Sequence, residues 1–503
     1  MTNLLKMLLA RGGLLVAAAL PLAACSLAPP YAPPKISVPE SFKGATAPFA
    51  PAKPQDQLAH GAWWTIFKDP ELDRLEVQLD AANPDLQAAV ETYTQARAVV
   101  GEVRSQLFPQ LSAQAFGSLN GESKHALFHN PSSLPTEESS LGYGAAVSWE
   151  PDLWGEVRNR TKFAKANAQA TAALVADARL SLELELANDY MKLRGLDTQH
   201  ALYVGTLSYY GDAVKITQLR YDSKIGAGLD LERAKDQLAQ AQAADTETQA
   251  QRELLVNAIA VLTGNNPSGF QIPVEILSNV TIPAVPAGVP STLLQRRPDI
   301  AAAERHVAAA NAAIGVARAA FYPNIRLGAD FGFEDDGLAL AALPESVWSV
   351  GSTAVLPIFE GGLRKAEEQQ SWSAFHEASD NYRSTVLQAF REVEDQLALT
   401  NKLATEFSQR QDAVTASLKV QTTAMQRYTS GIDNYLNVSV AQTAALSAEL
   451  GAVQVETRRL ETAINLIGAL GGGWDTASLP TEEQTIPFSP LSVGSKSSDV
   501  HEP

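Results

Sequence analysis

The chain has 503 residues, with 39 Lys and Arg against 56 Asp and Glu, and therefore a formal net charge of −17. This acidic balance argues against a nucleic-acid-binding protein, which would carry a basic patch or stripe. A single cysteine excludes a disulfide scaffold and any zinc site built from paired cysteines. Beyond the N-terminus no stretch reaches the ~18 consecutive apolar residues of a membrane helix, so a helical membrane transporter is excluded as well.

The N-terminal segment 1–24 has the pattern of a secretory signal peptide. Lys6 and Arg11 precede an apolar run from Gly12 to Ala24, which is too short for a stable membrane span. Leu22-Ala23-Ala24-Cys25 matches the bacterial lipobox, and Cys25 is the only Cys in the chain. We therefore predict cleavage before Cys25 and its modification with N-acyl and S-diacylglycerol lipid; the alternative is an ordinary signal peptide with an incidental Cys. Five prolines between positions 29 and 39 then predict an extended, polyproline-like tether.

The remaining sequence contains an internal duplication. Arg220-Tyr221-Asp222-Ser223 recurs as Arg427-Tyr428-Thr429-Ser430, at an offset of 207 (427 − 220). Phe108-Pro109 recurs as Tyr322-Pro323, at an offset of 214 (322 − 108), and the pattern Pro151…Gly155…Arg158 recurs at an offset of 206 (357 − 151). A period of this length indicates duplication of a large unit rather than a solenoid of short repeats.

Each half contains two stretches in which apolar residues alternate with small or polar ones. They lie at 111–115, 143–150, 325–334 and 348–356, and the last is the weakest. Such alternation is the pattern of a transmembrane β-strand, although a soluble hairpin with one wet face would show it too. Ser26 follows Cys25, with no Asp there to suggest retention at the inner membrane, so the lipobox indicates the outer membrane and favours the barrel. Four strands cannot close a barrel and open edges are not tolerated in lipid, so several copies must contribute. Residues 120–140 and 334–344 are predicted external loops.

Long helical runs separate the pairs of strands. Residues 156–224 contain no Pro and carry apolar residues at heptad spacing, which predicts a coiled-coil helix roughly 100 Å long. The second half repeats this pattern between positions 375 and 428. Other helices are predicted over 84–107, 229–263, 299–320 and 436–470.

These features resemble the TolC-like outer-membrane efflux family, and within it the NodT- or OprM-like lipoprotein branch. The motifs that carry the resemblance include the lipobox at Cys25 and Leu294-Gln295-Arg296-Arg297-Pro298-Asp299-Ile300. Further matching motifs are Phe321-Tyr322-Pro323, Leu356-Pro357-Ile358-Phe359-Glu360-Gly361-Gly362, Arg427-Tyr428…Gly431-Ile432-Asp433-Asn434-Tyr435-Leu436 and Trp63-Trp64…Asp69-Pro70-Glu71-Leu72. Together they extend over essentially the whole mature chain.

The resemblance implies a mixed α and transmembrane β fold. Three copies would form a 12-stranded outer-membrane β-barrel, with four strands from each chain, continued by a 12-helix α-helical barrel across the periplasm. It implies the lipid-anchored outer-membrane channel of a tripartite efflux or type I export system in a Gram-negative bacterium, and not an enzyme. Its partners would be a periplasmic adaptor, or membrane fusion protein, and an inner-membrane pump. Because a passive tube has no tight pocket, selectivity is expected to lie in the pump.

The corresponding division of the chain follows the duplication. We predict a signal peptide over 1–24, a lipidated tether and equatorial segment over 25–83, a first repeat over 84–263, a linker and equatorial segment over 264–298, a second repeat over 299–472 and a tail over 473–503.

The resemblance also implies a gate at the periplasmic tip, where each long helix turns into a shorter one. The candidate gate residues are Asp230, Glu232, Asp236, Asp433, Leu436 and Val440. Val440 and Thr443 stand where the family has an acidic and a basic residue, so an ionic lock is not expected. We predict instead an apolar constriction of Leu436 and Val440, with carboxylates supplied by residues 230–236. Each carboxylate has the alternative of being a solvated residue of a first helical turn.

Catalytic and metal sites are not supported by the sequence. His125 and His129 are four positions apart, but they lie in a predicted polar loop without a general base. Nucleophile-elbow, P-loop and dinucleotide-binding motifs are absent, and 4 Met are too few for a thioether ladder that would bind Cu(I). The alternative function is that of a structural trimeric coiled-coil lipoprotein, which explains the heptads and the lipid but not the four strands.

Overall fold

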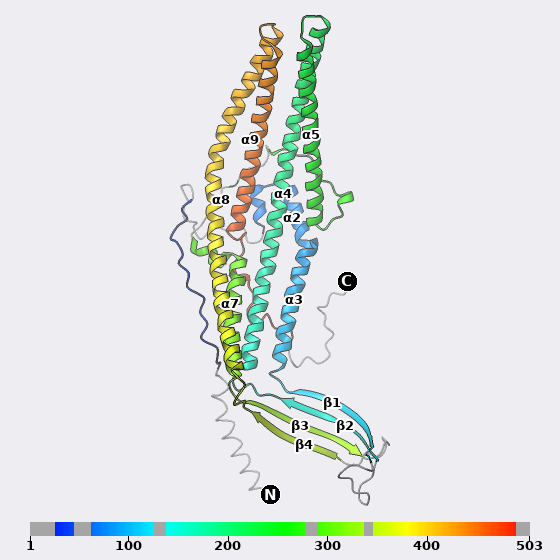
Figure 1. Cartoon of the computed structure of the whole chain (residues 1–503), viewed down its shortest axis with the longest axis vertical. Coiled ribbons are helices and arrows are strands. Elements are labelled where there is room, and N and C mark those ends of the chain that lie inside the picture. The colour runs from blue at the N-terminus through cyan, green and yellow to red at the C-terminus, as the bar shows by residue number, and fades with distance from the viewer. Residues whose placement is uncertain are drawn as a thin grey trace, which may run out of the picture.

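The computed structural model describes residues 26–44, 62–121, 123, 137–277, 283, 290–335 and 346–488. Long helices run side by side along the molecule, with a sheet at one end and two helix-to-helix turns at the other (Figure 1). Cys25, His125 and His129 lie outside the described residues, as do most of the predicted external loops. Within the described ranges no helix combines the length and the apolarity needed to cross a membrane.

The two repeats consist of the same elements in the same order. The first repeat contains α3 (Pro84–Ser105), β1 (Gln110–Gly121), β2 (Glu137–Trp149), α4 (Glu156–Asp222) and α5 (Gly228–Leu262). The second contains α7 (Pro298–Ala319), β3 (Asn324–Asp335), β4 (Ser346–Val355), α8 (Leu363–Thr429) and α9 (Tyr435–Ala469). Matched helices have equal lengths of 22, 67 and 35 residues, which confirms the predicted duplication.

The four strands form one antiparallel sheet in the order β1-β2-β3-β4, so that β2 and β3 join the two repeats. The predicted alternation is confirmed, because apolar residues of neighbouring strands pair on one face, for example Tyr143 with Phe333 and Phe331 with Trp348. The predicted loop boundaries are wrong. Strand residues 120–121, 137–140 and 334–335 fall inside those loops, because a ladder of backbone hydrogen bonds continues through polar residues.

Large buried side chains gather around the middle of the molecule and form what we call the equatorial core. A 3-10 helix, η2 (Trp63–Phe67), and α2 (Pro70–Ala82) lie there beside α4 and share one apolar cluster with side chains of α8 and α9 (Figure 1). Its fully buried members include Trp63, Phe67, Leu72, Leu75, Leu79, Leu186, Tyr190, Leu193, Val386, Val393, Leu397, Ile464 and Ile467. The sequence analysis predicted no helix here.

The signals for α2 were nevertheless present in the sequence. The Asp69 side chain caps the helix by accepting hydrogen bonds from the backbone N–H groups of Glu71 and Leu72, at 3.0 and 3.1 Å. Pro70 occupies the first helical position, where it is favoured. Residues 72, 75 and 79 then repeat at the spacing of one helix face.

The arginine of the Arg297-Pro298-Asp299 motif joins three helices. Its guanidinium binds the carboxylates of Asp299 and Glu392 at 2.8 and 2.7 Å and donates to the Ala469 carbonyl oxygen at 3.1 Å. The motif therefore links the start of α7, the middle of α8 and the end of α9. Shorter elements nearby are α6 (Leu293–Arg296), η3 (Pro267–Gly269), η5 (Pro290–Thr292) and η6 (Thr476–Ser478).

The described parts of the two terminal segments lie against the helices. Residues 26–44, here called the N-terminal strap, contain no helix or strand, and the Asn311 side chain donates to the Pro29 carbonyl oxygen at 2.9 Å. At its other end the Glu394 carboxylate accepts from the backbone N–H groups of Lys43 and Gly44, at 2.7 and 2.9 Å. The C-terminal segment is fixed by a bond of 2.9 Å from the Gln169 amide to the Pro480 carbonyl.

Candidate functional site

Two helix-to-helix turns form the end of the molecule that lies farthest from the sheet (Figure 1). The α4–α5 turn is closed by backbone bonds of 3.0 Å from Ile225 and Gly226 to the Arg220 carbonyl oxygen. The α8–α9 turn is closed in the same way by Ile432, whose N–H donates to the Arg427 carbonyl oxygen at 2.9 Å. Gly431 there has a φ of 72°, a conformation that glycine adopts without strain.

A small group of side chains, here called the tip cluster, holds the two hairpins together near these turns. It consists of Ala213, Ala234, Ala424, Tyr428, Tyr435, Val438 and Ala441. The Tyr428 and Tyr435 rings meet edge to face with centroids 5.6 Å apart. Because alanine contributes little apolar area, this core is much thinner than the equatorial one.

Leu436 and Val440 lie on the face of α9 that points away from the tip cluster. Their side chains are 43% and 61% exposed, whereas Tyr435, Val438 and Ala441 of the same helix are buried. Their spacing of four positions places them one turn apart on one face. The structure therefore brings these two predicted gate residues together on one exposed face of α9.

Asp433 is held inside its own hairpin. Its carboxylate pairs with Arg427 at 3.2 Å and accepts from the Asn437 amide and the Asn434 backbone N–H, at 2.7 and 2.9 Å. Hydrogen bonds from Asn437, Asn434 and Arg427 keep the pKa of Asp433 below its ordinary value. This aspartate organises the α8–α9 turn, and its charge is neutralised locally by Arg427.

The three predicted gate acids of α5 have different surroundings. Glu232 pairs with Lys235 at 2.9 Å, which neutralises its charge. Asp236 accepts from the neutral amide of Gln240 at 2.9 Å and has no basic partner among the described residues. Asp230 is half-buried beside the tip cluster. Burial first, and then neighbouring groups that include Asp230, raise the pKa of Tyr435 to about 12.

Sequence reasoning missed the polar contacts that join the two hairpins. The Arg220 guanidinium donates to the Tyr428 carbonyl oxygen at 2.8 Å and lies 4.6 Å from the centre of that ring. Farther from the turns, the Gln237 amide contacts the Ser439 carbonyl oxygen and accepts from the Tyr435 hydroxyl, at 3.4 and 3.3 Å. The only sequence signal was the duplicated Arg-Tyr pair.

The duplicated arginines have diverged in their contacts. Arg220 reaches across to the other hairpin, whereas its repeat partner Arg427 binds Asp433 within its own hairpin. The two arginines are equivalent in sequence but differ in role. Arg220 links the two hairpins, whereas Arg427 stabilises the turn of its own hairpin.

The start of the N-terminal strap lies beside the sheet end of the helices. The Ser26 hydroxyl donates to the Asn159 side-chain oxygen at 2.8 Å, near the first turn of α4. Arg318, near the end of α7, donates to the Leu27 carbonyl oxygen at 3.4 Å. These contacts place the residue that follows Cys25 next to the base of the strands. Within the described residues no group of three or more metal-ligating side chains occurs.

Comparison with known proteins agrees with this geometry. The chain is 32% identical over 466 residues to the outer membrane protein OprJ of Pseudomonas aeruginosa, covering 91% of this chain and 95% of OprJ. It is 31% identical over 457 residues to the toluene efflux pump outer membrane protein TtgC of Pseudomonas putida, covering 90% and 93%. The solved outer-membrane channel OprN superposes with a TM-score of 0.81 at 27% identity, covering 90% of this chain and all of that chain.

The family described as "Outer membrane efflux protein" matches residues 75–265 and 289–472, which are the two repeats. The match begins within α2, ends just past α9 and leaves out the segment between the repeats. The chain therefore belongs to the outer membrane efflux protein family, as an outer-membrane channel component.

Proposed function

We propose that three copies of this chain form an outer-membrane channel that continues as a helical duct through the periplasm and opens at the tip. The sheet is the observation that supports this most. Its edge strands β1 and β4 have no further strand beside them among the described residues, and lipid offers no hydrogen bonds to an open edge. Three such sheets joined edge to edge would close a barrel in which every strand is paired.

The cargo of this duct is proposed to come from an inner-membrane pump through a periplasmic adaptor. TtgC is named for toluene efflux and the related CusC of Escherichia coli for cation efflux. Similar channels thus bear the names of chemically unrelated cargo, which supports selection by the pump. The alternative of a purely structural lipoprotein leaves the sheet without a purpose.

The gate is proposed to be the ring that Leu436 and Val440 form when three tips meet around the axis. Their exposure on the face of α9 opposite the tip cluster supports this placement. The link from Arg220 to Tyr428 would hold the hairpins of one protomer together in the closed state. Asp230 and Asp236, which lack a basic partner among the described residues, would give the entrance a negative potential.

The lipid anchor is proposed to be Cys25, which would place the acyl chains beside the base of the barrel. The bond from Ser26 to Asn159 supports that position. Each buried CH₂ of an acyl chain contributes about 0.8 kcal/mol, so several chains hold firmly. Mass spectrometry of the mature N-terminus should show an acylated Cys25, and the Cys25→Ser variant should lose the anchor; an unmodified thiol or cleavage elsewhere would contradict this.

Planar-bilayer recording tests the channel itself. Purified protein should insert with a small conductance that rises when the tip is opened, and its mass in detergent should be that of a trimer. Expression in a host that lacks its own channel, together with the matching adaptor and pump, should restore resistance to a pumped compound. A protein of monomeric mass that gives no conductance would favour the structural alternative.

A further inference from the structure

A cavity of about 940 Å³, here called the α4 cavity, lies between α3, α4 and the C-terminal segment at positions 471–488. α3 and α4 run side by side (Figure 1). Tyr93 of α3 and residues between 471 and 480 complete the lining, and the volume is that of a site for a small organic molecule. The residues of α4 that line it recur along one face of the helix: Ala172, Val175, Ala176, Arg179, Leu180 and Glu183.

A run of three glycines brings the C-terminal segment onto α4. Gly471, Gly472 and Gly473 follow α9, and their φ angles of 96°, 58° and 86° are all positive. Glycine adopts this conformation without strain. A Cβ at Gly472 would also clash with the Leu180 side chain, so the backbone of the segment lies directly on α4. The glycines therefore let the chain turn after α9 and run along α4.

Aromatic and aliphatic side chains give the α4 cavity an apolar lining. The Tyr93 ring comes from α3, and the Trp474 ring packs against a cluster that contains Ala173 of α4. Leu180 and Leu479 add aliphatic surface. Both aromatic residues are only half-buried, which leaves part of each ring open to a ligand. The face of such a ring attracts a cation, most strongly where water is excluded.

Glu183 adds a carboxyl group to this apolar lining. It is 4% exposed, and among the described residues its one hydrogen-bond donor is the Trp63 indole, at 2.8 Å. Arg179 lies one helical turn away but pairs with Asp80, at 3.2 Å, rather than with Glu183. An ionised carboxylate buried without a cationic partner is costly, so Glu183 either holds a proton or needs a cation beside it.

A second buried carboxyl group lies close to Glu183. Glu76 of α2 is fully buried, and neither of its carboxylate oxygens has a hydrogen-bond partner in the described part of the chain. Burial, followed by the neighbouring Glu183, raises the pKa of Glu76 well above its ordinary value, which keeps Glu76 neutral. Burial raises the pKa of Glu183 only to about 7, so Glu183 is the group that can ionise near neutral pH.

The C-terminal segment contributes a further carboxylate to the lining. Asp475 accepts from the Ala477 backbone N–H at 2.8 Å and has no basic partner within the described ranges. Of the other charged groups, Arg179 alone lines the cavity, and it is already paired. The α4 cavity therefore combines ring faces with carboxylates that lack a cation. The other charged groups around it are Asp73, Asp80, Arg97 and Arg179.

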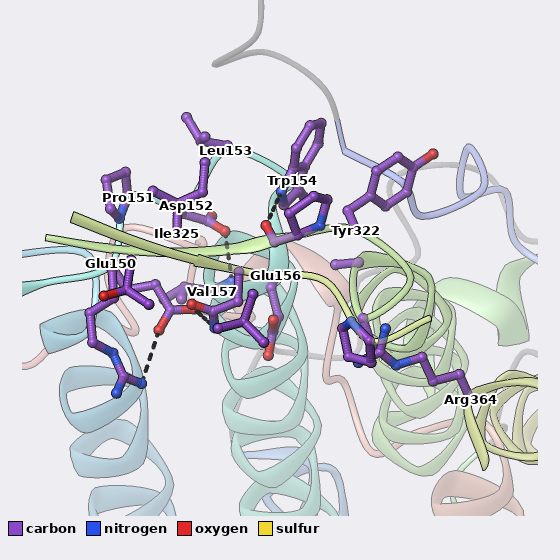
Figure 2. Close-up of a pocket in the computed structure, with 18 residues that line it drawn as sticks. Glu150, Pro151, Asp152, Leu153, Trp154, Glu156, Val157, Tyr322, Ile325 and Arg364 are labelled. Carbon is purple, nitrogen blue, oxygen red and sulfur yellow. Dashed lines mark hydrogen bonds and ion pairs between the residues drawn. The ribbon is translucent and has the colours of Figure 1, made fainter. Parts of the chain in front are cut away.

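The pocket at the sheet end of the helices differs in this respect. Its volume is about 480 Å³, and each charged side chain that lines it has an oppositely charged partner, at 2.6 to 3.6 Å. Asp152 also accepts from the Val157 backbone N–H at 3.1 Å, and the Trp154 indole N–H donates to the Pro323 carbonyl oxygen at 2.8 Å (Figure 2). The polar groups of that pocket bind one another, whereas those of the α4 cavity are left for an occupant.

We propose that the α4 cavity binds a small organic cation, in which an ammonium group is surrounded by apolar groups. The ammonium would lie beside the Glu183 carboxylate, and the apolar groups would contact the Tyr93 and Trp474 rings. Asp475 would add a second negative charge from the C-terminal segment. The occupant would thus hold that segment against α3 and α4. The site lies beside the equatorial core, which Glu183 joins through Trp63, and is separate from the tip.

Binding should depend on pH, because the cation needs Glu183 in its ionised form. Below pH 7 a proton must leave this carboxyl group before the cation binds. The dissociation constant should therefore rise about tenfold for each further unit that the pH falls. Glu183→Gln removes the titrating group, so its weaker binding should not change between about pH 8 and pH 6. Asp475→Asn should weaken binding but keep the pH dependence of the parent.

Calorimetric titration of the full-length protein in an uncharged detergent tests the site, with choline as the probe at about pH 8. The neutral control is 3,3-dimethylbutan-1-ol, in which a carbon atom replaces the charged nitrogen and the shape is kept. Choline should bind about tenfold or more tightly than this alcohol. Equal binding of the two compounds, or no binding of choline, would overturn the proposal.

Variants of the lining locate the bound choline. Glu183→Gln can still accept from Trp63 and should weaken choline binding about tenfold or more, with no change for the neutral alcohol. Glu185→Gln, at an exposed position of the same helix, is the matched control and should bind choline like the parent. Tyr93→Ala and Trp474→Ala should each weaken it about three- to tenfold. Equal weakening by Glu183→Gln and Glu185→Gln would show that choline responds to the general negative charge of the protein, which would overturn the site.

A heavy-atom analogue gives a direct view of the occupant. Crystals soaked with 4-bromobenzyltrimethylammonium should show an anomalous bromine peak beside Tyr93 and Trp474, and crystals of the Glu183→Gln variant should lack it. A peak in the parent that persists in Glu183→Gln would overturn the role of this carboxylate. Peaks confined to the tip or to other acidic surfaces would overturn the α4 cavity as the site.

Discussion

The equator and the tip of the helical part differ in how they are held together. The equatorial core contains large, fully buried side chains such as Trp63, Phe67 and Leu72, drawn from segments far apart in the sequence. The tip cluster consists mostly of alanines and two tyrosines, supplemented by single polar links. Buried apolar area is the main source of stability, whereas a single hydrogen bond contributes about 1 kcal/mol. Separating the hairpins at the tip should therefore require much less free energy than separating the helices at the equator.

Buried charges show the same contrast. At the equator Arg194 is 1% exposed and donates to Asp197, to the Tyr190 hydroxyl and to the Pro273 carbonyl oxygen, at 3.1, 2.9 and 2.6 Å. At the tip Arg220 has one carbonyl oxygen and one ring face. The proposed gate is thus the part of the helical region whose contacts are few and can be broken one at a time. Segments that open locally are generally drawn from the least stable parts of a structure.

The largest effect is expected at Trp63. Trp63→Ala removes a fully buried indole and the hydrogen bond of 2.8 Å that it donates to the Glu183 carboxylate. Loss of a buried Trp costs about 3–5 kcal/mol, so the variant should unfold at a markedly lower temperature in detergent. Trp348→Ala, which removes an exposed indole from β4, is the matched control. If both variants lowered the unfolding temperature equally, the equatorial core would not be the main source of stability.

The next effect is a pH dependence of the equator. Burial raises the pKa of Glu183 to about 7 from its ordinary 4.5, and burial together with Glu183 also raises the pKa of Glu76, whose carboxylate oxygens have no hydrogen-bond partner among the described residues. The neighbouring charged groups are Asp73, Asp80 and Arg179. Because the folded state retains a proton that the unfolded state has lost, the contribution of Glu183 to stability should be greatest below pH 4.5 and fall as the pH rises to about 7.

Glu183→Gln should flatten that decline, by up to about 3 kcal/mol across the interval, while its amide oxygen still accepts from Trp63. Glu185→Gln, at an exposed position of the same helix, should leave the slope unchanged. Thermal unfolding in detergent at several pH values measures both. A slope that persists in Glu183→Gln would show that another group carries the proton.

At the tip, Arg220→Ala should raise the single-channel conductance. It removes the bond to Tyr428 and the contact with its ring, which together contribute about 1–2 kcal/mol to keeping the hairpins closed. Arg427→Ala is the matched control, because Arg427 binds Asp433 inside one hairpin. If both variants opened the channel equally, the link between hairpins would not be what holds the tip closed.

The smallest effects are expected from the gate side chains themselves. Leu436→Ala should widen the pore without changing ion preference, and Leu229, its repeat partner, should act at nearly the same height.

Asp230→Asn with Asp236→Asn should lower cation preference with little widening, since their charges act over ~8 Å at physiological salt. Asp433→Asn should change selectivity less, because Arg427 already neutralises that charge. Bilayer recordings in which none of these variants differs from the parent would place the gate elsewhere along the duct.

Local patterns were enough for most of the secondary structure. Heptad spacing without proline predicted α4 over 156–224, and the structure has it at Glu156–Asp222. Alternation predicted all four strands, because each strand has one apolar and one polar or small face. The extent of β1 and β2 was underestimated, since their outer ends are held by partner strands rather than by an apolar pattern. Glycines and prolines marked the boundaries because they fix or free the backbone itself.

The candidate gate was only partly accessible in this way. The position of Leu436 and Val440 on one face follows from helix geometry alone. The neutralisation of Asp433 by Arg427 could not be read from the sequence, because a separation of six positions across a turn has no fixed distance. The link from Arg220 to Tyr428 joins positions 208 apart, and such contacts depend on how whole helices pack.

The sequence by itself determined the duplication, the alternation of strands and long helices and the lipobox, since each is a pattern of neighbouring residues or of one segment repeated. The tertiary structure decided which copy of each duplicated feature is covered and which is left exposed. Nine residues between Val157 and Ala173 of α4 are buried, whereas none of the matched positions of α8 is, although both helices have the same length. The physical reason is that α4 has neighbours on both sides within one chain, whereas α8 lies at its edge, and burial depends on neighbours rather than on propensity.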